Sequence, residues 1–307
     1  MKVSDYSLDE LVDQAGSHDG FSLDIGPFVV NIRSREQRFL ETLQVLYQHF
    51  PVAPPHSFID FHLSVTRPSN HRRWVKSQVL FLIDGRVLFE PFPLDHATPL
   101  FEWGLNWCIA TRAHQNLMLH SAVVEKNGKA MILPAFPGSG KSTLCAALAQ
   151  RGWRFLSDEF GLIRPRDGQV IPIPRPTPLK NESIEVIREF APEAVLGPSF
   201  PKTRKGTVAH LRAPEESVRW LREVATPAWI VFPQYQAGSE VQLTGVGKPY
   251  ALFKLATNAF NYEVHGTAGF ALVRDLVKSC DCYNLVYSNF DDVIARLDDL
   301  VLASHGI

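Results

Sequence analysis

A glycine-rich stretch constrains this chain more than any other feature of its sequence. It reads Ala-Phe-Pro-Gly-Ser-Gly-Lys-Ser-Thr over residues 135–143, between an apolar run typical of a strand and a segment with helical spacing of apolar residues. Glycines let successive backbone N–H groups point at one anion, and the start of a helix adds its positive end. The stretch therefore predicts a P-loop that binds a polyphosphate in an α/β domain.

The residues of this loop have distinct expected parts. Lys141 would supply a mobile charge to the β- and γ-phosphates, and the Ser142 hydroxyl would hold Mg²⁺. The usual pattern has a glycine six residues before the lysine, where this chain has Ala135, and a chance glycine turn between strand and helix is the alternative interpretation. The predicted nucleotide-binding residues are Pro137, Gly138, Ser139, Gly140, Lys141, Ser142 and Thr143.

Composition excludes several classes of protein. A chain of 307 residues suits two domains or one large one. Its net charge of −1 gives no basic field that would indicate nucleic acid, and no run of about 18 apolar residues could span a membrane. The start is polar and acidic, unlike a secretory signal, and four cysteines do not form a disulfide framework. We therefore expect a cytoplasmic protein with neither nucleic acid nor membrane as a partner.

The pattern of apolar residues and turns divides the chain in two. Residues 1–95 are predicted to form a smaller α+β domain of unknown role, and residues 96–307 an α/β domain that contains the P-loop. In the first domain we expect a strand over 21–32, a helix over 35–49, a strand over 58–65 and a hairpin around Asp84-Gly85. In the second we expect helices over 98–115, 142–151, 182–190, 248–260 and 266–279 and from 288, strands over 154–157, 229–232 and 283–287, hairpins around Asn127-Gly128 and Asp167-Gly168, and a long loop over 197–206.

A pair of adjacent acids follows the P-loop in the sequence and could serve its chemistry. A P-loop enzyme needs a second anchor for Mg²⁺ and a group that orients or deprotonates the nucleophile. Asp158 and Glu159 come 17 and 18 residues after Lys141, at the end of the strand predicted over 154–157. Adjacent acids also occur as a solvated strand end, so the pair alone leaves both interpretations open.

The order of these features resembles the HPr kinase/phosphorylase family, most closely the branch called HprK-related kinase A. That family has a histidine before a hairpin, the P-loop, a helix ending in Arg-Gly and then two consecutive aspartates. This chain has, in the same order, His120, the loop, Arg151-Gly152 and Asp158-Glu159. The resemblance covers about residues 115–175, and thinly the rest to 305. It implies an HPr-kinase-like (PEP-carboxykinase-like) fold for the second domain and a kinase that uses ATP and Mg²⁺.

The resemblance also implies roles for individual residues. Glu159 matches the proton-accepting aspartate of the family, Asp158 a metal or water-bridged ligand, and His120 a histidine of the catalytic site. Glutamate is one methylene longer than aspartate, so which acid of the pair accepts the proton stays open. A lone histidine is also compatible with a purely structural role.

Downstream, the match to the family becomes thinner. Residues 179–183 stand where the family has a Leu-Glu-Ile-Arg-Gly signature, which makes Glu182 a candidate metal ligand beside Ser142 and Asp158, and places Lys180 near phosphate. Glu182 also suits the first turn of a helix, where acids are favoured. The signature tied to phosphorylase activity is absent. In its place is a basic segment expected to contact phosphates or an acidic substrate, or to be simply solvated; its cations are Lys202, Arg204 and Lys205.

These features predict transfer of the ATP γ-phosphate to a hydroxyl group. The resemblance implies that this hydroxyl belongs to a serine or threonine. The resemblance implies that the phosphoacceptor partner is a protein or peptide, and the sequence is compatible with a homo-oligomer. Two alternatives stay open: a small-molecule kinase, and a nucleotide-gated binding module with little phosphotransfer. A kinase would transfer label from ATP to an acceptor, whereas a gate would show only binding or slow hydrolysis.

Overall fold

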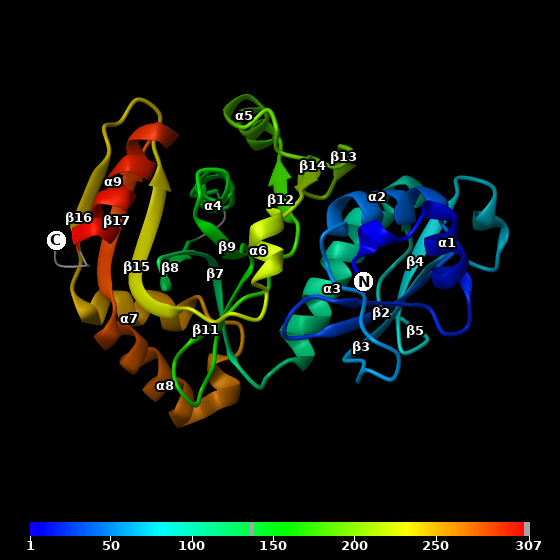
Figure 1. Ribbon diagram of the computed structural model, residues 1–307, viewed down its shortest axis with the longest axis horizontal. Coiled ribbons are helices and arrows are strands. Elements are labelled where there is room, and N and C mark those ends of the chain that lie inside the picture. Colours follow the sequence, from blue (N-terminus) through cyan, green and yellow to red (C-terminus); the bar gives the residue numbers. More distant parts are fainter. Residues whose placement is uncertain (136–137, 304–307) are drawn as a thin grey trace.

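Three β-sheets organise the described part of the chain, which is residues 1–135 and 138–303 of a computed structural model (Figure 1). The N-terminal part, blue to teal, gathers on one side of the molecule, and the larger sheet lies on the other. Helix α3 (Ala97–Arg112) lies between them. The fold is mixed α/β, as predicted.

The N-terminal sheet has the strand order β1-β2-β3-β4-β5, with β6 paired to β4. Helices α1 and α2 pack on each other beside it, and α3 packs against β3 and β4. The single strand expected over 21–32 is wrong, because the chain turns at Gly26 (φ 97°) and forms two antiparallel strands. The elements are β1 (Phe21–Asp24), β2 (Val29–Ser34), β3 (Phe61–Thr66), β4 (Gln78–Ile83), β5 (Arg86–Val87), β6 (Phe92–Pro93), α1 (Leu8–Gly16) and α2 (Gln37–Tyr47), with short 3₁₀ turns at Val3–Asp5, His71–Arg73 and Leu94–His96.

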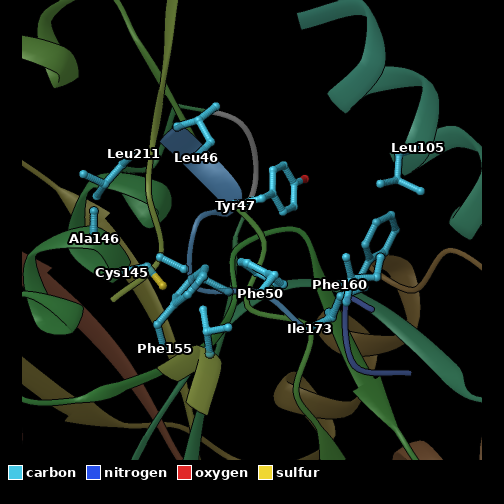
Figure 2. Packing of buried hydrophobic residues seen from close by; sticks show 14 of the residues in the cluster. Leu46, Tyr47, Phe50, Leu105, Cys145, Ala146, Phe155, Phe160, Ile173 and Leu211 are labelled. Atoms are coloured by element: carbon cyan, nitrogen blue, oxygen red, sulfur yellow. The ribbon is translucent and has the colours of Figure 1, made fainter. Parts of the chain in front are cut away.

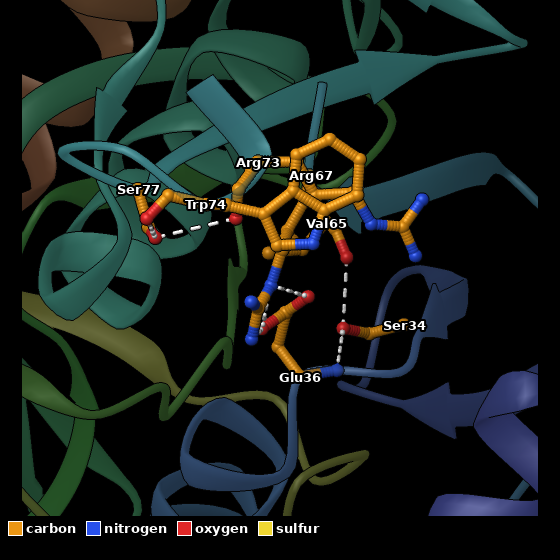
Figure 3. Close-up of polar contacts among 7 residues, drawn as sticks. All are labelled: Ser34, Glu36, Val65, Arg67, Arg73, Trp74 and Ser77. Carbon is orange, nitrogen blue, oxygen red and sulfur yellow. Dashed lines mark hydrogen bonds and ion pairs between the residues drawn. The ribbon is translucent and has the colours of Figure 1, made fainter. Parts of the chain in front are cut away.

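Polar contacts fix the point where β2 ends and α2 begins (Figure 3). The Ser34 hydroxyl donates to the Val65 carbonyl at 2.8 Å and accepts from the Glu36 N–H at 3.1 Å. The Glu36 carboxylate accepts hydrogen bonds from the Arg67 guanidinium at 2.9–3.0 Å. A planar guanidinium that pairs with a planar carboxylate through several hydrogen bonds fixes their relative orientation better than a single hydrogen bond does. The start of α2 is therefore tied to both central strands of this sheet.

The larger sheet carries the glycine-rich loop. Its strand order is β11-β10-β7-β8-β15-β17-β16, with β9 paired to β7, and β8, β15 and β17 run parallel. The loop follows the carboxyl end of β8 and leads into α4, the place where α/β sheets commonly bind ligands. The bounds are β7 (Leu117–Lys126), β8 (Lys129–Pro134), β9 (Arg154–Ser157), β10 (Phe160–Ile163), β11 (Val170–Ile171), β15 (Thr226–Tyr235), β16 (Gln242–Gly245), β17 (Asp281–Tyr287) and α4 (Lys141–Ala149).

Helices cover both faces of this sheet. Successive side chains of a strand point to opposite faces. Accordingly, Ile132 and Ile230 join the apolar cluster under α7 and α8, whereas Leu133 and Val231 join the cluster under α4 and α9. The helices are α7 (Lys248–Thr257), α8 (Tyr262–Ser279, interrupted at Gly266) and α9 (Phe290–Ala303). No helix in the described ranges is long and apolar enough to cross a membrane.

A third sheet replaces the long loop that the sequence predicts over 197–206. Strands β12 (Thr177–Lys180), β14 (Gly206–Leu211) and β13 (Phe200–Thr203) lie in that order beside α5 (Glu182–Phe190) and α6 (Glu215–Arg219). The loop prediction is wrong because Phe200 pairs with Val208 and both are buried, which the basic, proline-containing composition concealed. The turn that joins β13 and β14 consists of Arg204 and Lys205.

The apolar core is continuous across the boundary that the sequence predicts at residue 95. Figure 2 shows Tyr47 and Phe50 of the N-terminal part near Cys145 and Phe155 of the larger sheet and its helix. All belong to one buried cluster. The division of the chain into residues 1–95 and 96–307 stays a prediction, because shared packing of this kind does not test it.

Candidate functional site

The glycine-rich loop is held in place by β15 and β17, the two strands that follow β8 in the order of the sheet. Gly138 and Gly140 have φ values of 89° and 85°, which favour glycine, and α4 begins directly at Lys141. The Tyr287 hydroxyl donates to the Gly140 carbonyl at 3.1 Å. A Cβ on Gly140 would lie 2.6 Å from that hydroxyl oxygen, so a side chain there would force the tyrosine away. The loop is thus packed where it joins the helix.

The other described loop residues, Ser139, Ser142 and Thr143, lie beside the start of α4. The Ser139 carbonyl accepts from the Tyr235 N–H at 3.0 Å, while its buried hydroxyl has no hydrogen-bond partner within the described ranges. Ser142 and Thr143 are half-buried in the first turn of α4. Pro137 lies outside the described residues. A helix start preceded by two glycines in the left-handed region can bind an anion.

Lys141 and Asp158 meet in a buried position. The Lys141 side chain is only about 9% exposed, and its ammonium donates to the backbone carbonyl of Asp158. Its Nζ lies 3.6 Å from the Asp158 carboxylate. Both carboxylate oxygens of Asp158 are buried and accept no hydrogen bond from any other described residue. A buried carboxylate left without hydrogen bonds is costly, so this position is suited to receive a cation, as Mg²⁺ binding requires.

Strand pairing brings His120 to Glu159. The register of β7 and β10 sets His120 opposite Phe160, so that His120 Nε2 lies 3.7 Å from Glu159 Oε1. The His120 ring also packs on Phe260, with ring centroids 5.3 Å apart. Burial and the nearby Lys141 ammonium lower the pKa of His120, against the opposing effect of Glu159. The imidazole is therefore mainly neutral near pH 7 and can orient the Glu159 carboxylate without fully neutralising it.

A cavity of about 380 Å³ adjoins the acid pair. Asp158, Glu159 and Phe160 form one part of its lining, and residues of α3 form another. None of the described loop residues 138–143 lines it. The α3 residues in the wall are Pro99, Glu102, Trp103, Asn106, Trp107 and Ala110.

The structure brings only some of the predicted basic and acidic residues to this cavity. Lys180, Arg204 and Lys205 line it, whereas Lys202 and Glu182 are exposed and do not. Partial burial and the Lys205 ammonium lower the pKa of Lys180, although Glu159 opposes this. Among the described residues, no group of three or more histidines, cysteines or acids gathers closely enough to hold a metal. The roles of Lys202 and of Glu182 as a metal ligand stay predictions.

A buried polar network in the wall of the cavity was missed by the sequence interpretation. Glu102 Oε2 lies 2.5 Å from the Arg175 guanidinium, and its other oxygen accepts from the Tyr47 hydroxyl at 2.7 Å. Arg175 also donates to the Asn106 side chain at 2.5 Å. These residues come from three distant segments and form no motif. The spacing of Trp103 and Trp107, four residues apart on one helix, was the signal that could have indicated the aromatic wall.

His210 in β14 should make the stability of the protein depend on pH. Burial lowers the pKa of this histidine below its ordinary value of 6.5, and its Nδ1 has no hydrogen-bond partner among the described residues. His210 therefore binds a proton more readily in the unfolded chain than in the folded one. Its contribution to the free energy of unfolding rises with pH up to about 6.5 and is lost as the pH falls below that value. In urea unfolding, we expect the free energy of unfolding of His210→Gln to fall less than that of wild type as the pH is lowered from neutral to about 5. This window includes the ordinary histidine pKa. Equal pH slopes would contradict this assignment.

Comparisons with known proteins give limited information. No protein-family model matches the chain, and no curated protein matches it. Among solved structures, the chain is similar to the Hpr(Ser) kinase/phosphatase from Coxiella burnetii, with 9% sequence identity and a TM-score of 0.25. That match covers 61% of this chain and 98% of the other. A likeness of this size assigns neither a family nor an activity, so the function has to be argued from the site itself.

Proposed function

We propose that this protein is an ATP- and Mg²⁺-dependent phosphotransferase that transfers the γ-phosphate to a hydroxyl group. The observation that supports this most is the position of the acid pair. Asp158 is paired with Lys141 at the glycine-rich loop, and Glu159, the next residue, faces a cavity beyond it. Phosphoryl transfer needs a donor site and an acceptor space that share adjacent carboxylates.

Each residue of the proposed site would have a separate role in the reaction. The loop N–H groups and Lys141 would bind the β- and γ-phosphates, and Ser142 and Asp158 would hold Mg²⁺. The bound Mg²⁺ would neutralise charge on the phosphate oxygens. Glu159 would take the proton of the acceptor hydroxyl while the hydroxyl oxygen of the acceptor forms a bond to the γ-phosphorus. The bond from that phosphorus to the β-γ bridging oxygen breaks, and ADP leaves with the electron pair.

The alternatives differ in what they require of Glu159. A nucleotide-gated binding module has no need for a carboxylate that lines a cavity and lies 3.7 Å from a mainly neutral histidine. This geometry favours the phosphotransferase over the gate. The serine or threonine acceptor in a protein or peptide, implied by the sequence resemblance, stays a prediction.

Incubation with γ-labelled ATP and an extract of the source cells tests the proposal. We expect an acceptor to become labelled in the presence of Mg²⁺ and not when the metal is chelated. The α-labelled nucleotide is the control, because it should leave its label on ADP. Binding of Mg-ATP with no label transferred to any component of the extract would favour the gate and contradict the phosphotransferase.

A further inference from the structure

We infer that the phosphoacceptor is a small molecule with an anionic group and an apolar body, bound in the cavity between α3 and the acid pair. This inference rests on the proposed function and deepens it by naming a substrate class. It departs from the protein or peptide acceptor that the sequence resemblance implies. Four features of the cavity support it: its position, size, aromatic wall and charge.

The position of the cavity is that of an acceptor site. Its wall includes Asp158 and Glu159, yet none of residues 138–143. A triphosphate seated on the loop would therefore approach the acids from one side and leave the cavity free on the other. A hydroxyl in the cavity next to Glu159 would have its proton acceptor at hand.

The size of the cavity suits a small ligand. A volume of about 380 Å³ lies within the range of small-molecule sites, roughly 300–1,000 Å³. Helix α3 and the β13–β14 turn contribute to its lining, through Ala110 and Lys205 among others. A small molecule fits whole into a space of this volume.

The wall on α3 offers aromatic surface that is already in place. Trp103 stacks on Phe89 with ring centroids 4.1 Å apart, and Trp107 meets the same ring edge to face at 5.9 Å. Even so, Trp103 is 38% exposed, and Phe260 on the far wall is 44% exposed. Rigid, partly exposed aromatic rings in a cavity are typical of a ligand site. They favour an acceptor with an apolar, preferably flat, body.

The charges of the cavity indicate the anionic group. Arg175 and Glu102 both line the cavity and neutralise each other in an ion pair of 2.5 Å. Lys180, Arg204 and Lys205 line the cavity, and none of them takes part in the ion pairs found among the described residues. Desolvation lowers the pKa of Lys180 most, and the Lys205 ammonium lowers it further, while Glu159 and Asp158 oppose both effects. A carboxylate or phosphate on the acceptor would relieve this clustering of positive charge.

Filling the cavity provides the first test. Ala110 lines the cavity from α3, and Thr111, the next residue, is exposed and does not line it. The cell extract is separated into a small-molecule filtrate and a macromolecular retentate, and each is incubated with γ-labelled Mg-ATP. Wild type and Thr111→Phe should label a compound in the filtrate. Ala110→Phe should raise the KM for that compound about tenfold or more, the equivalent of about 1.4 kcal/mol of binding, with Mg-ATP binding unchanged.

The charged residues provide the second test. Arg204→Ala and Lys205→Ala should raise the KM for the filtrate compound more than the KM for ATP, and added salt should reduce the difference from wild type because it screens the attraction. Lys278→Ala is the matched control, because Lys278 is an exposed basic residue on α8 that does not line the cavity. An increase confined to the KM for ATP would make these residues a phosphate lid and contradict the anionic acceptor.

The outcomes separate this inference from the proposed function. Label only in the retentate would overturn the small-molecule acceptor while supporting the phosphotransferase. Unchanged labelling of the filtrate by Ala110→Phe would also overturn the inference, since the acceptor would then bind elsewhere. Mg-ATP binding without label in either fraction would overturn both.

Discussion

Replacing Glu159 with glutamine should lower the rate of phosphoryl transfer by roughly 10²- to 10⁴-fold, the usual contribution of a positioned general base. The amide keeps the shape of the side chain but has no basic oxygen to take the hydroxyl proton. Glu159 is half-exposed toward the cavity, so the substitution should not disturb the core. Single-turnover transfer from γ-labelled ATP measures the rate, and Mg-ATP binding should be unchanged.

Two further substitutions show whether this loss is specific. Glu193→Gln removes an exposed carboxylate that does not line the cavity and should leave the rate unaltered. Asp158→Asn should instead raise the concentration of Mg²⁺ needed for activity, because Asp158 is the proposed metal ligand. Wild-type turnover in Glu159→Gln, together with a collapse in Asp158→Asn, would show that the two acids have the opposite roles.

Replacing Lys141 with alanine should abolish the thermal stabilisation that Mg-ATP gives to the protein. At a free ligand concentration of a hundred times Kd, binding stabilises the folded state by about 2.7 kcal/mol. Lys141 is the buried cation at the start of α4, so the variant would lose the charge that we propose to bind the β- and γ-phosphates. Differential scanning fluorimetry of each protein with and without Mg-ATP measures the shift.

Lys141→Ala should also lower the free energy of unfolding of the protein in the absence of nucleotide. Asp158 would remain buried without its cation, and breaking a buried ion pair in this way costs about 3–5 kcal/mol. The double variant Lys141→Ala/Asp158→Asn removes the stranded charge and should recover part of that loss without recovering the response to ATP. A folded Lys141→Ala variant that Mg-ATP stabilises as strongly as wild type would refute the assignment of the loop.

Features encoded by a few adjacent residues could be predicted from the sequence. Asp84-Gly85 and Asn127-Gly128 form the expected hairpin turns, with all four residues at positive φ. The helix over Glu182–Phe190 and the strand over Arg154–Ser157 have the expected bounds. Each of these follows from local backbone preferences and apolar spacing, which act within about ten residues, so a single sequence is enough.

Features that depend on distant partners could not be predicted. The β13–β14 hairpin is stabilised by the burial of Phe200 and Val208 against the rest of the fold, and its basic composition indicated a loop instead. Likewise, the contact of His120 with Glu159 follows from the register of β7 and β10, which no local pattern specifies. The cavity wall on α3 depends on how the two parts of the chain pack, so its residues carry no motif.

Two separate parts of the chain line the cavity, so the choice of acceptor could change independently of nucleotide binding. One wall belongs to the sheet that carries the glycine-rich loop, and the other belongs to a helix that packs on the N-terminal sheet. Substitutions along Trp103, Trp107 and Ala110 could therefore alter which acceptor is chosen while the donor machinery stays constant. In an engineering setting, grafting a different α3 face onto this scaffold would be the direct route to a new acceptor with unchanged use of ATP.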